Sequence, residues 1–404
     1  MRVGSRLCFW LSVGVVCLAI GSGCATIRSN ADDPLLRPCT DGYALTKDGW
    51  KLGIRHLKPF HPDPNKLPVV LCHGLGLNGT FWTITDGHLA GQLVARGYEV
   101  FIPDMRGSGA SQRVGPVGKV NTVLRQTPLK EIGSGRWTVD DEIRYDVPAI
   151  LEFIKERTGR DQVNWVGHSL GGMLMLGYLG TDAHPERVAN FVGMGSTVIL
   201  ADAPEHDMLR ANRALRVLLS CLSTGRMARP MRWGRPPGLD RIDGFYYTAA
   251  NVDSRTIDRF YGSTLEDPGR GAFVQLDPYL EFGRMVSADR KIDYTKELDH
   301  VTTPTLMIAG DSDYMSSVHS TQLTFDALGS PDKTLLRFGK AEGHVDDYGH
   351  CDLVWSRYAP VEVFPPIIDW LDRRQPTMTS IWPVLPSPQQ VMPSPQHALP
   401  SPQH

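Results

Sequence analysis

One feature constrains the fold of this chain more than any other: strand-like apolar runs alternate with helix-like segments. The helix-like segment at 138–159 begins with Thr138 followed by Asp141, a capping-box-like start, and ends at Gly159. Continuous apolar runs bounded by glycine or proline are typical of strands buried on both faces. Their alternation with helices predicts an α/β fold, a doubly wound, mostly parallel sheet with helices on both faces. The runs occupy 67–74, 98–104, 162–168, 188–195, 303–310 and 333–339.

The alternation is interrupted once, between Thr197 and Val301, where no buried strand is evident. The segment 206–225 is helical by its period, and a connector rich in proline, glycine and arginine follows it. We therefore predict a mainly helical cap or lid insertion over 200–300. It divides the sheet domain into a first part at 31–199 and a second part at 301–375.

Both ends of the chain are expected to lie outside this domain. Residues 1–23 combine a basic start, an apolar run and small residues, which is typical of a signal peptide. Cys24 follows in "GSGCAT", which resembles the lipobox of bacterial lipoproteins, although Gly21 stands where leucine is usual. The resemblance implies lipidation of Cys24 and anchoring to a membrane of the cell envelope; a plain secreted protein or an uncleaved anchor is the alternative. Residues 376–404 repeat "PSPQ" and are predicted to be a disordered, proline-rich tail.

Composition excludes some classes of function. The formal net charge is −2, and no run of five or more like charges occurs, so the chain lacks the electrostatic footprint of a nucleic-acid-binding protein. Beyond the signal segment and Cys24, four cysteines remain in a chain of 404 residues, which is too few for a disulfide framework.

The segment "NWVGHSLGG" carries the strongest chemical signal. Gly167-His168-Ser169-Leu170-Gly171 is a G-x-S-x-G sequence between a predicted strand and a predicted helix, the context that a nucleophile elbow requires. In such a turn the serine hydroxyl points out of the sheet. The helix N-terminus behind it presents N–H groups to a developing oxyanion. A tight structural turn is the simpler alternative, but glycines alone would satisfy it.

A second loop follows the strand at 67–74. His73-Gly74 in "LCHGLGLNGTFW" puts the N–H of Leu75 where it could complete an oxyanion hole with the N–H of Leu170. The alternative is a glycine-rich loop around a packed histidine.

Two late loops hold the candidates for acid and base. A nucleophilic serine needs an imidazole to accept its proton and a carboxylate to orient that imidazole. The carboxylate candidates are Asp311 and Asp313, and the imidazole candidates are His344 and His350. The spacing does not decide between them. The same loop suggests metal ligands as a rival interpretation, but the spacing of His344, Asp346, Asp347, His350 and Asp352 matches no familiar metal motif.

These motifs together resemble the α/β-hydrolase family, and the core is most similar to its acid lipase branch (gastric and lysosomal). The stretches that carry the resemblance are "TKDGWKLGIRHL", "VVLCHGLGLNGTFW", "GYEVFIPDMRGSGAS", "RYDVPAILEFIKERTGRDQVNWVGHS" and "GHCDLVWSRYAPVEVFPPIIDWL". The resemblance implies Ser169 as nucleophile, Asp313 as acid, His350 as base, and Leu75 and Leu170 as oxyanion donors. It implies structural roles for Asp104 and for the turn 106–109. The chain departs from acid lipases at Leu170, where they tend to have glutamine, and across 200–300.

The predicted function is hydrolysis of carboxylic esters by a serine esterase or lipase, with no cofactor or metal. A lipid or small-molecule ester is the expected substrate. An acyltransferase or a polyester depolymerase could use the same residues. A non-catalytic, lipid-anchored binding protein with this fold is the alternative from another class.

Overall fold

The computed structural model describes residues 39–116, 119–120, 137–182, 184–201, 225, 228–232 and 240–376. Four predictions therefore lie outside the described residues. They are the signal peptide, lipidation of Cys24, nearly all of the helix at 206–225, and the tail beyond residue 376.

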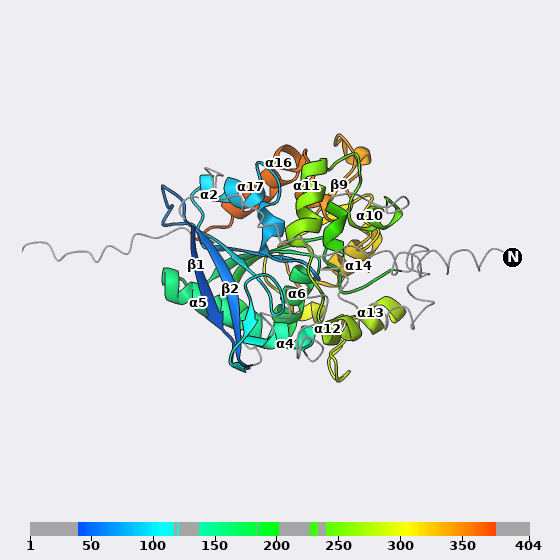
Figure 1. Ribbon diagram of the computed structural model, residues 1–404. Helices are drawn as coiled ribbons and strands as arrows, with labels where there is room; N and C mark the ends of the chain where they lie inside the picture. Colours follow the sequence, from blue (N-terminus) through cyan, green and yellow to red (C-terminus); the bar gives the residue numbers. More distant parts are fainter. Residues whose placement is uncertain are drawn as a thin grey trace, which may run out of the picture.

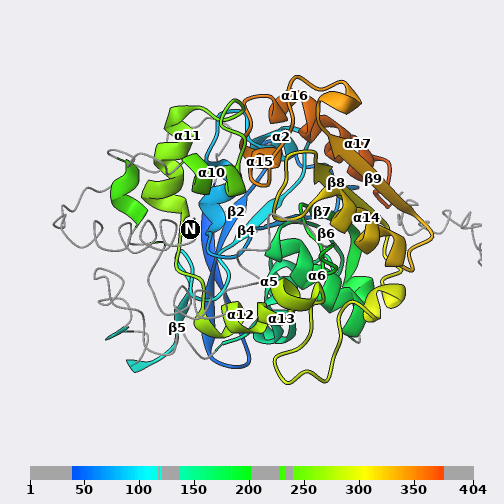
Figure 2. The same ribbon diagram turned by 90° about the vertical axis from the view of Figure 1, so that its right-hand side faces the viewer.

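The described strands form one sheet, ordered β1-β2-β4-β3-β6-β7-β8-β9, with β5 paired to β2 (Figures 1 and 2). Strands β4, β3, β6, β7, β8 and β9 pair in parallel, so the predicted mostly parallel α/β fold is confirmed. Each of the six predicted apolar runs contains one of these strands. The bounds are β1 Cys39–Leu45, β2 Trp50–Leu57, β3 Val69–Cys72, β4 Val100–Pro103, β5 Gln112–Arg113, β6 Val163–His168, β7 Val188–Met194, β8 Thr305–Gly310 and β9 Lys333–Phe338.

Strands β1, β2 and β5 pair antiparallel and were not predicted. In β1, Asp41, Tyr43 and Leu45 are exposed, whereas Gly42 and Ala44 are buried. An edge strand with one solvated face shows alternation instead of a continuous apolar run. The pattern of continuous apolar runs therefore does not include β1.

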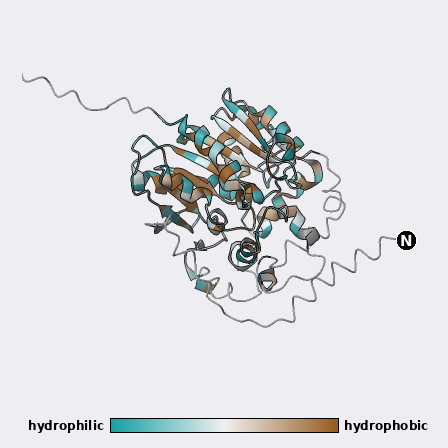
Figure 3. Cartoon of the chain, turned by 90° about the horizontal axis from the view of Figure 1, so that it is seen from above, coloured by the Kyte–Doolittle hydropathy of each residue, from teal (hydrophilic) through white to brown (hydrophobic). Residues whose placement is uncertain are grey.

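Helices cover both faces of the sheet. Neighbouring residues of one strand contribute to opposite cores: Val70 packs in the cluster with α5 and α6, and Val69 and Leu71 pack with α2 and α17. Figure 3 shows the apolar colour concentrated in the central strands. The helices are α2 Leu89–Ala95, α4 Val139–Asp141, α5 Val147–Thr158, α6 Leu170–Thr181, α10 Asp240–Tyr246, α11 Ser254–Arg259, α12 Arg270–Gln275, α13 Asp277–Phe282, α14 Val318–Ala327, α15 Asp352–Trp355, α16 Ala359–Glu362 and α17 Phe364–Asp372.

The segment 138–159 begins and ends as predicted. The Thr138 hydroxyl accepts from the Asp141 N–H, the Asp141 carboxylate accepts from the Thr138 N–H, and Gly159 closes the helix with φ 70°. The helix is not uniform, however, because Glu142–Asp146 form a π-helical turn between α4 and α5. A π turn changes which side chains face inward, and such turns are frequent at functional sites.

The described part of 200–300 contains α10 to α13 and isolated β-bridges, with no strand of the main sheet. It is tied to the first part of the core, where Leu77 bridges Leu265 and the Glu266 N–H donates to the Gly76 carbonyl at 2.7 Å. The limits of this insertion stay a prediction. Among the described helices, none combines the length and apolar character needed to span a membrane.

Candidate active site

Ser169 lies in the sharp turn between β6 and α6. Its φ of 53° and ψ of −123° put a non-glycine residue in the left-handed half of backbone space, a position that costs roughly 1–3 kcal/mol where the surroundings enforce it. Hydrogen bonds hold it there: the Ser169 N–H donates to the Met194 carbonyl, and the Ser169 carbonyl accepts from Gly172 and Met173. The side chain is half-buried. This is the geometry of a nucleophile elbow.

The two glycines of the motif are needed for close packing. A methyl group on Gly167 would lie 2.5 Å from the carbonyl group of Gly171. One on Gly171 would collide with the Cys72 and His73 carbonyls at the end of β3. Strand β6, helix α6 and the loop after β3 therefore meet with no room for side chains.

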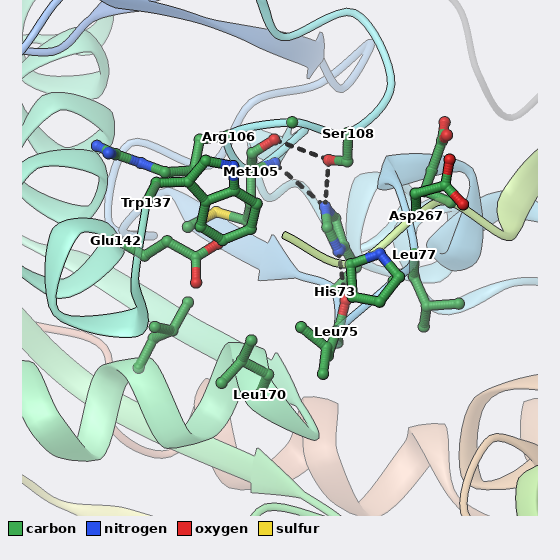
Figure 4. A pocket seen from close by; sticks show the side chains of 16 residues that line it. His73, Leu75, Leu77, Met105, Arg106, Ser108, Trp137, Glu142, Leu170 and Asp267 are labelled. Atoms are coloured by element: carbon green, nitrogen blue, oxygen red, sulfur yellow. Dashed lines mark hydrogen bonds between the residues drawn. The ribbon is translucent and has the colours of Figure 1, made fainter. Parts of the chain in front are cut away.

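The loop after β3 lies against the elbow, since a methyl group on Gly74 would be 2.9 Å from the Ser169 Cβ. Buried His73 fixes this loop. Its Nδ1–H donates to the Gly74 carbonyl at 2.9 Å, and its Nε2 accepts from the Met105 N–H at 3.2 Å (Figure 4). Burial lowers the His73 pKa, so the ring is neutral, in agreement with this donor and acceptor pattern. His73 thus has a structural role.

Leu75 and Leu170, the two predicted oxyanion donors, line the same pocket. Neither backbone N–H has an acceptor among the described residues. The Leu170 N–H belongs to the first turn of α6, where helix N–H groups have no partner within the helix and attract negative charge.

Asp313 and His350 are brought together by the loops after β8 and β9. The His350 Nδ1 lies 2.8 Å from the Asp313 Oδ2, and both side chains are buried. The other Asp313 oxygen accepts from the N–H groups of Met315 and Ser316 at 2.9 and 2.8 Å. The carboxylate is therefore fixed on one side by backbone and on the other by the imidazole.

The competing candidates lie in other surroundings. Asp311 contacts the exposed Arg337 guanidinium at 3.0 Å and packs against Gly339. The His344 Nδ1 is bonded to the Gly339 backbone, and its ring lies against Phe338 at 4.8 Å between centroids. Among the described residues, no contact joins Asp311 or His344 to Asp313 or His350.

Two residues that the sequence analysis did not assign connect this pair to the elbow. Gly195 follows Met194, the acceptor of the Ser169 N–H, and a methyl group on it would lie 3.0 Å from the Asp313 Oδ2 and 3.1 Å from the His350 Nδ1. The buried His168 ring donates from Nε2 to the His350 carbonyl at 2.8 Å. Burial, and then proximity to His350, lower the His168 pKa, which keeps this ring neutral. The signal that could have identified His168 is a histidine at the end of a fully buried strand.

Asn251 ties the insertion to the loop of His350. Its Nδ2 donates to the Asp352 Oδ2 at 2.6 Å and to the Asp347 carbonyl at 2.8 Å. The Cys351 N–H donates to the Tyr246 carbonyl. Burial raises the pKa of Asp352 to about 7. Asp352 is thus a buried side chain that anchors the loop directly after the candidate base, which is two residues earlier at His350.

The predicted turn at 104–109 is built around ion pairs and backbone bonds. Asp104 accepts from the Gly79 and Ala110 N–H groups, each at 2.7 Å. The buried Arg106 guanidinium pairs with Asp146 at 2.6 Å and with Asp48 at 2.8 Å. Burial raises the pKa of Asp146 to about 6, against the pull of Arg106.

Within the described ranges, no three His, Cys, Asp or Glu side chains converge as metal ligands would. The residues of the rival interpretation are engaged separately, since Asp346 pairs with Lys340 at 2.7 Å and His350 pairs with Asp313. Cys72 and Cys351 are buried and unpaired.

Comparisons with known proteins agree with this fold. The sequence profile of a family described as alpha/beta hydrolase fold matches residues 68–356. The chain is 28% identical to human lysosomal acid lipase/cholesteryl ester hydrolase over 373 residues, covering 84% of this chain and 88% of that protein. It is 21% identical to mouse gastric triacylglycerol lipase over 82% of this chain and 88% of that protein. The match to the rat gastric lipase is 30% identical but spans only 37% of this chain and 36% of that protein.

Solved structures share the fold. An esterase from Thermogutta terrifontis superposes with a TM-score of 0.54 at 17% identity, covering 83% of this chain and all of its own. A bacterial membrane phospholipase A superposes with a TM-score of 0.55 at 15% identity, covering 92% of this chain and 96% of its own. At these identities the likeness concerns the fold alone.

Proposed function

The chain belongs to the alpha/beta hydrolase family, and from that premise we propose that it hydrolyses carboxylic esters as an esterase or lipase, with Ser169 as nucleophile. The observation that carries the proposal is the position of Ser169 in a strained strand–helix turn close to a buried Asp313–His350 pair. The Ser169 N–H is bonded to the Met194 carbonyl, and the next residue, Gly195, packs against that pair. The acid lipases among its relatives support an ester, and a lipid ester in particular, as substrate.

The proposed reaction follows from the roles of these groups. His350 accepts the Ser169 proton as the oxygen attacks the ester carbonyl, and Asp313 holds the Nδ1–H of the imidazolium that forms. The N–H groups of Leu75 and Leu170 stabilise the oxyanion, each donor contributing about 3–4 kcal/mol in comparable sites. His350 then protonates the leaving alcohol. Water, activated by the same imidazole, releases the acid from the acyl-enzyme.

The first experiment tests Ser169 directly. The protein lacking residues 1–24 is treated with a fluorophosphonate probe and assayed on p-nitrophenyl esters of increasing chain length. We expect Ser169→Ala to abolish labelling and to lower kcat by at least about 10³-fold. Ser254→Ala, which changes an exposed serine on α11, is the matched control and should retain both signals. Equal labelling of wild type and Ser169→Ala would contradict the proposal. Labelling without hydrolysis would favour an acyltransferase.

We also propose that the protein is exported and anchored by a lipid on Cys24. The support is the signal-like segment 1–23 with small residues before the cysteine. Radiolabelled palmitate should enter the wild type but not Cys24→Ser, and the variant should leave the membrane fraction. Membrane association that survives the substitution would refute lipidation as the anchor.

A further inference from the structure

The lining of one pocket includes both proposed oxyanion donors, Leu75 and Leu170, but neither Asp313 nor His350. It has an accessible volume of about 20 Å³, enough for one ordered water or one small substituent. The apolar side chains of its lining include Leu75, Leu170, Leu174 and Met105. Glu142 and Trp137 line the same pocket, from the π-helical turn and from the residue just before Thr138 (Figure 4).

Two polar atoms of residues that line this pocket have no hydrogen-bond partner among the described residues. The Glu142 Oε2 and the Trp137 Nε1 are buried atoms without a hydrogen bond to any described residue. The side chains are almost inaccessible, with exposed fractions of 2% for Glu142 and 7% for Trp137. Unsatisfied buried polar groups are rare and cost about 1–3 kcal/mol each, so a pair lining one cavity calls for a ligand atom.

Glu142 does not form an ion pair with Arg106, the cation next to it. The adjacent Arg106 gives its donors to Asp146 and Asp48, at distances from 2.6 to 3.1 Å. Burial, followed by the negative charge of Asp146, raises the pKa of Glu142 well above its usual range. This shift favours the neutral carboxylic acid, which both donates and accepts hydrogen bonds.

The indole of Trp137 is held in a fixed position. A methyl group on Gly107 would lie 3.1 Å from its Cζ2, and one on Gly269 would collide with the same ring. Its N–H is a donor only. An oxygen atom in the pocket could accept from the indole and pair with the carboxylic acid, satisfying both groups at once.

We propose that this pocket binds a hydroxyl or oxo oxygen of the substrate, close to the scissile ester, through Glu142 and Trp137. The inference rests on the proposed ester hydrolysis and specifies its substrate class as oxygen-substituted esters. The oxygen could belong to the acyl chain, as in a hydroxyacyl ester, or to the alcohol, as in a partial ester of a polyol. A plain ester would leave both buried groups unpaired, which is how polar pockets discriminate against analogues that lack the matching group.

The experiment compares matched esters by pH-stat. Methyl hexanoate is measured against methyl 3-hydroxyhexanoate and methyl 3-oxohexanoate, and propyl hexanoate is measured against 2-hydroxyethyl hexanoate. We expect kcat/KM to be about tenfold higher for the oxygenated ester in one of the two sets. The set that shows the preference identifies whether the acyl or the alcohol part enters the pocket.

Variants then test the two side chains. Glu142→Gln keeps a neutral donor and acceptor of the same shape and should keep the preference. Glu142→Met removes both and should bring the ratio toward one, as should Trp137→Phe if Glu142→Met fails to fold. Glu156→Met, which changes an exposed glutamate on α5, should leave the ratio unchanged.

The outcomes separate this inference from the proposed function. Hydrolysis of plain esters with ratios near one in both sets would overturn the inference alone, and the pocket would then hold a structural water. A preference that survives both Glu142→Met and Trp137→Phe would also overturn it. Absence of hydrolysis together with absence of Ser169 labelling would overturn the proposed function, and this inference with it.

Discussion

The two sides of Ser169 differ in how their polar groups are satisfied. On the side of β8 and β9, the Asp313 oxygens are used by His350, Met315 and Ser316, and His168 holds the His350 carbonyl. On the side of the π-helical turn, Glu142 and Trp137 line a pocket, and each has a buried polar atom without a hydrogen bond to any described residue. We interpret the first as a fixed arrangement for proton transfer and the second as a place for a substrate atom.

Burial alone therefore does not identify a catalytic group. Asp146, Glu142 and Asp313 are all buried carboxyl groups. Asp146 is matched by Arg106, Asp313 by an imidazole and two N–H groups, and Glu142 has no cation beside it that is free to pair. Their partners, more than their burial, distinguish the structural, catalytic and ligand-binding roles that we propose for them.

The largest expected effect tests the histidine of the proton-transfer side. His350→Ala removes the group that contacts Asp313 and should lower kcat by at least about 10³-fold. His344→Ala, in the same loop but bonded to the Gly339 backbone, should change kcat by less than about threefold. Steady-state hydrolysis of a p-nitrophenyl ester measures both. The reverse order of effects would show that the described pairing is not the catalytic one.

A similar pair of variants tests the acid. Asp313→Asn keeps the shape but presents the wrong hydrogen-bonding pattern to the imidazole, and we expect a loss of about 10²–10⁴-fold in kcat. Asp311→Asn affects a surface ion pair with Arg337, worth at most about 1 kcal/mol, and should leave kcat nearly unchanged. Equal effects of the two variants would show that the contact between Asp313 and His350 is not the one that supports proton transfer.

We expect the side of the π-helical turn, where Glu142 and Trp137 line the pocket, to depend on Arg106 for its stability. Arg106→Met leaves Asp146 buried without its counterion, which should lower the free energy of unfolding by about 3–5 kcal/mol. Urea denaturation followed by tryptophan fluorescence measures the change. The exposed Arg373→Met is the control, with an expected change below about 0.5 kcal/mol. An unchanged midpoint for Arg106→Met would show that the network does not support this side.

The smallest effect concerns pH on the proton-transfer side. Because the pKa of Asp352 is raised to about 7 by burial, the folded protein holds this proton between about pH 4 and 7, whereas the unfolded chain releases it. Unfolding therefore releases a proton in this window. The contribution of Asp352 to stability is present at low pH and falls by about 1.4 kcal/mol per unit as pH rises.

Asp352→Asn should remove that dependence. The difference in unfolding free energy between variant and wild type should shift in favour of the variant from pH 4.5 to 7, by roughly 3 kcal/mol. Urea titrations at several pH values provide the measurement. Parallel stability curves for the two proteins would show that Asp352 is charged in the folded state throughout.

Features that depend on neighbours along the chain could be predicted from the amino-acid sequence. The apolar runs located six parallel strands, Thr138 and Gly159 marked the ends of a helical segment, and the glycines around Ser169 indicated the elbow. Each depends on backbone conformation or periodicity within a few residues, so a local pattern is sufficient. The edge strand β1 was not predicted, because its alternation depends on which face meets water, and its neighbour β2, which lies between β1 and β4, was not predicted either.

Which distant side chains meet depends on the folded arrangement of the sheet and its loops. Asp313 and His350 are separated by 37 positions, and His168 and His350 by 182, so spacing cannot distinguish them from Asp311 and His344. The π-helical turn Glu142–Asp146 has no marker in the sequence pattern, and the surroundings of Glu142, which lines a pocket with Arg106 and Leu170, depend on residues distant along the chain. Hydrogen bonds form over about 3 Å in space, and only the folded sheet brings these groups within that distance.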